Sequence, residues 1–122
     1  MKKILIVDDR KEIRDLVEMT LRSRDYQIIQ AENGEQALVV ARAEKPDLIF
    51  MDLEMPGGMD GLDTTRALRG FPETSKCPII ILTGSEGPYY SMAEALKSGA
   101  TDYFAKPFSP LRLITKVEEL IG

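Results

Sequence analysis

Five polar side chains stand where apolar segments of this sequence end. Asp8 and Asp9 follow one such segment, Asp52 follows another, and Thr83 and Lys106 close two later ones. Crowded carboxylates repel each other, and a bound divalent cation relieves that repulsion. Oxygen ligands without histidine or cysteine favour Mg²⁺. If the fold gathers these side chains, they predict phosphoryl transfer at a magnesium site. Asp52 would be the carboxylate nucleophile, Lys106 would neutralise charge on the transferring group, and Thr83 would donate a hydrogen bond to it.

Strands alternating with helices must position these side chains. The expected strands cover residues 4–7, 26–31, 47–52, 79–83 and 102–105. The expected helices run from about 10 to 23, from the Asn33-Gly34 turn to about 44, from about 62 to 69, from 88 to about 98, and onward from an N-cap at Ser109. This alternation implies a parallel sheet with helices on both faces. Ligands bind such open sheets at the carboxyl ends of the strands, where the five side chains would meet. Spacing alone leaves the strand order open.

Helical spacing also predicts which side chains face the core. In the first helix, the residues that recur at helical spacing are Ile13, Leu16, Val17, Thr20 and Leu21. In the fourth helix, Met92, Ala95 and Leu96 are expected on the inner face. Both helices are therefore predicted to be amphipathic.

The composition is that of one soluble domain. The chain has 122 residues and a net charge of −4, without a run of basic residues, so direct nucleic-acid binding is not expected. No apolar stretch is long enough for a membrane span or a signal-peptide core, so we expect a cytoplasmic protein. Cys77 is the sole cysteine, which excludes an internal disulfide. With no histidine in the chain, any phosphohistidine must belong to another molecule.

The chain resembles the receiver domain of two-component response regulators over essentially its whole length. The segments that carry the resemblance are ILIVDD at 4–9 with Arg14, DLIFMDLEMP at 47–56, MDGL at 59–62, PIIILTG at 78–84 and GATDYFAKPF at 99–108. The resemblance implies a flavodoxin-like, doubly wound (βα)5 fold with strand order 2-1-3-4-5 and helices on both faces. It also implies that residues 1–122 form a single receiver domain.

The resemblance assigns roles to the acidic residues. It implies that Asp52 takes a phosphoryl group from the phosphohistidine of a histidine kinase. Asp9 would bind Mg²⁺ directly and Asp8 mainly through water. The backbone carbonyl of Glu54 would be a further ligand.

The resemblance also implies a switch. Lys106 would contact the phosphoryl group, and its bond to Pro107 is expected to be cis, in a turn that aims a side chain. The Thr83 hydroxyl would move toward the phosphate, and the Tyr103 ring would turn inward to fill the vacated space. The plainer alternatives are that Thr83 is simply a β-branched strand end and that Tyr103 is an ordinary half-buried aromatic.

The implied partners are a sensor histidine kinase or phosphotransfer protein, and a downstream protein target or fused output domain. The surface that switches would be the fourth helix, the fifth strand and the fifth helix. We expect a monomer, with a phosphorylation-dependent dimer as the alternative. Asp102 and Lys116 could pair across such a dimer, but Thr101 stands where a second acid is usual. The sequence is compatible with a stand-alone receiver or with one cut from a longer regulator.

Two other functions share parts of this pattern. A Mg²⁺-dependent phosphatase would use the same aspartyl phosphate, but Glu54 stands where its second aspartate belongs. A flavin carrier would need a hydroxyl- and glycine-rich phosphate loop after the first strand, where this chain has acids. The chain also departs from the receiver pattern by one extra residue near Gly57-Gly58 and another between Thr83 and Gly99. These insertions bear on the rim of the site.

Overall fold

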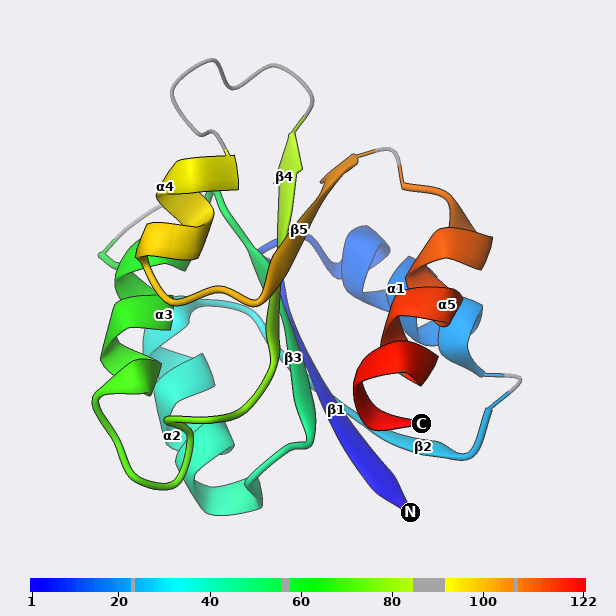
Figure 1. Cartoon of the computed structure of the whole chain (residues 1–122), viewed down its shortest axis with the longest axis horizontal. Coiled ribbons are helices and arrows are strands. Elements are labelled where there is room, and N and C mark those ends of the chain that lie inside the picture. The colour runs from blue at the N-terminus through cyan, green and yellow to red at the C-terminus, as the bar shows by residue number, and fades with distance from the viewer. Residues whose placement is uncertain (23, 56–57, 85–91, 107) are drawn as a thin grey trace.

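A computed structural model of the chain describes residues 1–22, 24–55, 58–84, 92–106 and 108–122. Its strands form one parallel sheet of order β2-β1-β3-β4-β5, as Figure 1 shows. The strands are β1 (Lys2–Val7), β2 (Tyr26–Ala31), β3 (Leu48–Asp52), β4 (Ile79–Gly84) and β5 (Asp102–Lys106). The helices are α1 (Lys11–Leu21), α2 (Gly34–Glu44), α3 (Gly61–Arg69), α4 (Met92–Lys97) and α5 (Pro110–Ile121). The expected flavodoxin-like fold is confirmed.

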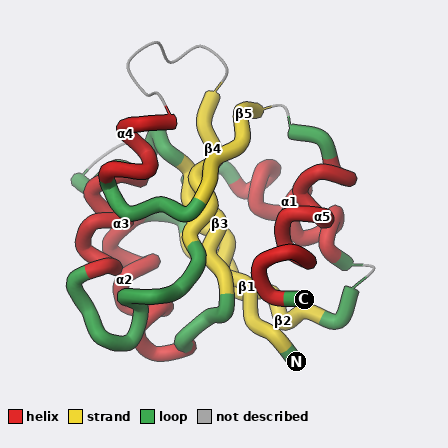
Figure 2. The backbone as a smooth tube through the Cα atoms, in the orientation of Figure 1, coloured by secondary structure: helices red, strands yellow, loops and turns green. Residues whose placement is uncertain are grey.

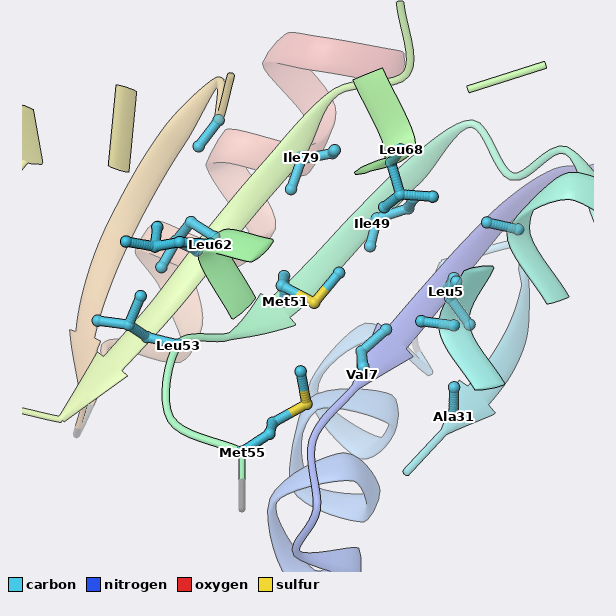
Figure 3. Packing of buried hydrophobic residues seen from close by; sticks show 14 of the residues in the cluster. Leu5, Val7, Ala31, Ile49, Met51, Leu53, Met55, Leu62, Leu68 and Ile79 are labelled. Carbon is cyan, nitrogen blue, oxygen red and sulfur yellow. The ribbon is translucent and has the colours of Figure 1, made fainter. Parts of the chain in front are cut away.

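The helices cover both faces of the sheet. α1 and α5 lie on one face, and α2, α3 and α4 lie on the other (Figure 1, Figure 2). Because successive side chains of a strand point to opposite faces, each strand contributes to both cores. Ile4 and Phe50 pack on the α1–α5 side, whereas Leu5 and Met51 pack on the α2–α4 side, shown in Figure 3. This two-sided burial explains why the central strands are continuous apolar runs.

A close approach of backbone to backbone fixes the end of β3. Gly61, the first residue of α3, sits so near this strand end that an added Cβ would lie 2.2 Å from the carbonyl oxygen of Asp52. The Gly61 amide donates to the carbonyl oxygen of Leu53 at 3.0 Å. Asp60 caps α3 through the amide of Asp63. The turn after Asp52 is therefore held against the start of α3.

Several element ends differ from the sequence expectations. β1 begins at Lys2 because its pairing with β2 continues past the apolar run. The described part of α4 begins at Met92, and the expected start at residue 88 lies outside the described residues. Ser109 caps α5 as expected, accepting from the amide of Arg112.

Two inner-face predictions are wrong. Leu16 and Leu96 are exposed. In α1, the buried positions are Arg14, Val17 and Leu21, so a charged residue occupies part of the stripe that spacing assigned to apolar residues. Spacing alone could not place Arg14 inside, because its burial depends on partners from other elements.

Within the described residues, no helix combines the length and the apolar character that crossing a bilayer requires.

Candidate functional site

The carboxyl ends of the strands bring the predicted polar side chains together. Asp8 and Asp9 follow β1, Asp52 ends β3, and Lys106 ends β5. A pocket of about 220 Å³ opens at this edge of the sheet. Its lining residues are Asp9, Arg10, Asp52, Glu54, Gly84 and Lys106. Parallel topology thus gathers residues that are up to 98 positions apart in the sequence.

The three aspartates form a set of hard oxygen donors. One carboxylate oxygen from each of Asp8, Asp9 and Asp52 lies within 4.8 Å of the others. Asp8 and Asp52 are buried, and Asp9 is exposed. The cluster could therefore bind a metal ion, and its all-oxygen donors suit a hard divalent cation. The exposed Asp9 leaves such an ion a route from solvent.

Lys106 stands between two of these acids. Its Nζ donates to Asp8 Oδ2 at 3.0 Å and to Asp52 Oδ1 at 2.9 Å. The exposed fractions of the Lys106, Asp8 and Asp52 side chains are 13%, 0% and 5%, respectively. Buried charges are tolerated only when they are paired. The ammonium therefore balances part of the negative charge at this edge.

The environment of Asp52 favours its protonated form. Burial is the main cause, and it raises the pKa of Asp52 from 3.8 to about 6. The hydrogen bond from Lys106 lowers this pKa, whereas the charges of Asp8 and Asp9 raise it. A carboxylate held this way is poorly solvated and gains from any cation that reaches it.

The two expected switch residues share one face of the sheet. Thr83 pairs with Ala105 and Ile81 with Tyr103, so Thr83 and Tyr103 both lie on the α2–α4 side. The buried Thr83 hydroxyl donates to the carbonyl oxygen of Gly84 at 3.2 Å. Tyr103 is half-buried against the core.

The other predicted features of the site are the Glu54 ligand, the cis bond before Pro107 and the two longer loops. The side chain of Glu54 is exposed at the rim of the pocket. The expected cis bond between Lys106 and Pro107 lies outside the described residues, as does part of each extended loop. Sequence reasoning missed Arg10, whose backbone amide donates to Asp8 Oδ1 at 2.9 Å. Its place directly after the two acids was the available signal.

A family model for the response regulator receiver domain matches residues 4–118. The chain belongs to this family. Among curated proteins, this receiver is 40% identical over 119 residues to the transcriptional regulatory protein ResD of Bacillus subtilis, covering 98% of this chain and 48% of the relative. It is 38% identical over 120 residues to the phosphate regulon transcriptional regulatory protein PhoB of Pseudomonas aeruginosa, covering 98% and 52%. The receiver chain thus spans about half the length of these relatives.

Solved structures of response regulators have the same fold as this chain. A putative response regulator from Chloroflexus aurantiacus superposes with a TM-score of 0.90 at 33% identity, covering 98% of this chain and 96% of that one. The chemotaxis protein CheY4 of Vibrio cholerae superposes with a TM-score of 0.89 at 32% identity, covering 99% of both chains. The chain is therefore a receiver, a phospho-acceptor switch of two-component signalling. The phosphatase alternative is not favoured.

Proposed function

We propose that this receiver takes its phosphoryl group onto Asp52 in a Mg²⁺-dependent reaction. The donor would be the phosphohistidine of a sensor histidine kinase or phosphotransfer protein. The observation that carries the proposal is the placement of Asp52. It is a buried carboxylate at a strand end, 2.9 Å from an ammonium and beside two further acids. Nucleophile, charge compensation and metal ligands are the parts that phosphoryl transfer needs.

Each residue of the site has a chemical task in this proposal. An Asp52 carboxylate oxygen forms a bond to phosphorus as the bond from phosphorus to the donor imidazole nitrogen breaks, and that nitrogen keeps the electron pair. Asp9, Asp52 and the backbone carbonyl of Glu54 would hold Mg²⁺ directly, and Asp8 would hold it through water. When bound, Mg²⁺ supplies positive charge against the phosphoryl oxygens. Lys106 would exchange part of its contact with the acids for a phosphoryl oxygen.

The chain would act on no other substrate. We propose that it promotes its own phosphorylation and the later hydrolysis of the aspartyl phosphate. In this respect it is a switch whose chemistry resets its own state. Residues 1–122 would form a single receiver domain that is monomeric without the phosphoryl group.

Phosphorylation would act on the surface of α4, β5 and α5. The phosphoryl group adds about −1.5 to −2 charges, and the Thr83 hydroxyl would leave the Gly84 carbonyl to donate to it. Tyr103 would then turn inward. A tenfold change in the population of two states needs only about 1.4 kcal/mol, which one exchanged hydrogen bond and one repacked ring can supply. A downstream protein or a fused output domain would bind this surface.

The β5–α5 side of that surface already has a hollow of about 580 Å³. Tyr103, Leu111 and Arg112 line it, and Leu111 is 71% exposed. Asp102 and Lys116 form an ion pair within the chain at 3.0 Å. The two groups thus pair with each other within one chain.

Intact mass after incubation with acetyl phosphate tests the proposal. Wild type with Mg²⁺ should gain one phosphoryl group, whereas wild type in EDTA and the Asp52→Asn variant with Mg²⁺ should gain none. Labelling of Asp52→Asn equal to that of wild type would refute the assignment of the acceptor. If wild type gains no mass, a beryllofluoride titration separates a site that cannot bind a phosphoryl mimic from one that turns over too fast to trap.

A further inference from the structure

Arg14 is a buried charge on the inner face of α1. Only 9% of the residue is exposed. Its Nη1 donates to the carbonyl oxygen of Asp8 at 2.7 Å, and its Nε donates to Gln30 Oε1 at 2.9 Å. Burying a guanidinium is unfavourable unless its donors are used. Arg14 thus ties α1 to the end of β1 and to β2, which an apolar residue in the same stripe could not do.

The carbonyl that Arg14 binds belongs to the peptide unit between Asp8 and Asp9. That unit is planar, so holding its oxygen restricts the direction in which both acidic residues leave the chain. The other polar groups of Asp8 are also held. Its amide donates to the carbonyl oxygen of Ala31 at 3.2 Å, its Oδ1 accepts from the Arg10 amide, and its Oδ2 accepts from Lys106 Nζ. Arg14 therefore holds the backbone carbonyl of Asp8, which forms the peptide bond to Asp9.

Gln30 is itself oriented by acids of α1. Its Nε2 donates to Glu18 Oε1 at 2.7 Å and to Asp15 Oδ1 at 3.3 Å. Because the amide nitrogen is engaged there, the amide oxygen is turned toward Arg14. A connected set of hydrogen bonds thus runs from the surface of α1 to the Asp8–Asp9 peptide.

We infer that Arg14 is a positioning residue for the metal site, with Gln30 as its support. It holds the Asp8–Asp9 peptide so that both carboxylates face Asp52. The inference rests on the proposed function, since it takes these acids to be ligands of Mg²⁺. Outer groups that orient metal ligands typically change metal affinity by about 10- to 100-fold when removed. Arg14 acts through the acids and does not touch the ion.

The test is calorimetric titration of Mg²⁺ into wild type, Arg14→Ala and a matched control, Arg69→Ala. Arg69 also binds backbone carbonyls, those of Gly99 at 2.8 Å and Cys77 at 2.6 Å. These carbonyls precede β5 and β4, so Arg69 lies at the opposite edge of the sheet. Both variants should lower the Tm. Only Arg14→Ala should raise the Kd for Mg²⁺, by about tenfold or more.

Hydrogen exchange in EDTA gives a second readout that needs no metal. Amides of residues 8–14 should exchange faster in Arg14→Ala than in Arg69→Ala. Gln30→Met should raise the Mg²⁺ Kd by a smaller factor and leave Arg14 in place.

The outcomes separate this inference from the proposed function. If wild type does not bind Mg²⁺, the proposed function fails. If wild type binds and Arg14→Ala binds with the same Kd despite a lower Tm, Arg14 is only a structural residue and the inference is overturned. Should Arg14→Ala not fold, an unchanged Kd in Gln30→Met overturns it instead.

Discussion

The ammonium of Lys106 lies 2.9 Å from the carboxylate of Asp52, and both side chains are almost fully withdrawn from solvent. The same ammonium contacts Asp8 at 3.0 Å. Lys106 therefore lies between two acids that a bound cation would share. Lys106 is both a stabilising counter-charge and a competitor for the acids.

Lys106→Ala should separate these two roles. Removing one partner of a buried ion pair leaves uncompensated charge, so we expect the free energy of unfolding in EDTA to fall by about 2 to 4 kcal/mol. Mg²⁺ should restore most of the loss, because the acids remain and no longer share their oxygens with an ammonium. Phosphorylation of this variant should no longer change its affinity for a partner. Chemical denaturation with and without Mg²⁺ measures the first effect, and partner titration measures the second.

The exposed pair of Lys11 and Asp15 offers the control. Its Nζ and Oδ2 lie 2.7 Å apart in solvent. Such pairs contribute little, so Lys11→Ala should leave both readouts unchanged. A normal phosphorylation response in Lys106→Ala would contradict the role given to Lys106 in the switch.

Asp52→Asn should be more stable than wild type at neutral pH when both are kept in EDTA. Burial raises the pKa of Asp52 to about 6, so between about pH 4 and 6 the folded protein binds the proton more tightly than the unfolded chain. Stability therefore decreases as the pH rises through this window. The shift corresponds to at most about 3 kcal/mol at pH 7. Urea titrations at pH 4.5 and pH 7.5 should show a clearly larger advantage of the Asp52→Asn variant at the higher pH, and an equal advantage at both would contradict the shift.

Gly61→Ala should damage both the fold and the site. The added Cβ would meet the Asp52 carbonyl oxygen at 2.2 Å, so β3 and α3 would have to move apart at the residue that carries the acceptor. We expect a loss of about 1 to 3 kcal/mol in the free energy of unfolding and slower labelling by acetyl phosphate. Gly70→Ala is the control, because its Cβ would lie 3.3 Å from the carbonyl oxygen of Ala67. Gly70 follows the last residue of α3, at the other end of the helix from Gly61. Equal losses in the two variants would argue against a specific role of Gly61.

The parts that could be predicted from the sequence are those set by local pattern. The apolar runs of β1 and β3 indicated strands because both faces of these strands are buried. The alternation of strands and helices then predicted that Asp8, Asp9 and Asp52 would meet at one edge of a parallel sheet. The strand order came from the resemblance to receivers, because spacing carries no information about which strands are neighbours.

The parts that could not be predicted depend on contacts between distant elements. Leu16 has the right spacing for the inner stripe of α1, yet it is exposed, whereas Arg14 occupies an inner position. The sequence pattern marks Thr101 only as standing where a second acid is usual. In the structure its hydroxyl accepts from the amide of Ile79 at 3.0 Å, which ties the start of β4 to β5. Neither relationship is visible before the strands are paired.

Thr83→Ala and Thr83→Ser should distinguish phosphorylation of Asp52 from the conformational response of β5 and α5. The Thr83 hydroxyl donates to the Gly84 carbonyl, whereas Lys106 donates to Asp52, so Thr83 is not the group that orients Asp52. Labelling of Asp52 should therefore proceed in both variants. In wild type and Thr83→Ser, beryllofluoride should change hydrogen exchange in β5 and α5, because a hydroxyl is present to move toward the phosphoryl mimic. In Thr83→Ala that change should be lost, since no hydroxyl is present to move toward the phosphoryl mimic and the space that it would vacate is already open without the mimic. A full response in Thr83→Ala would show that the signal reaches β5 by another route, for which Lys106 at the end of that strand is the nearest candidate.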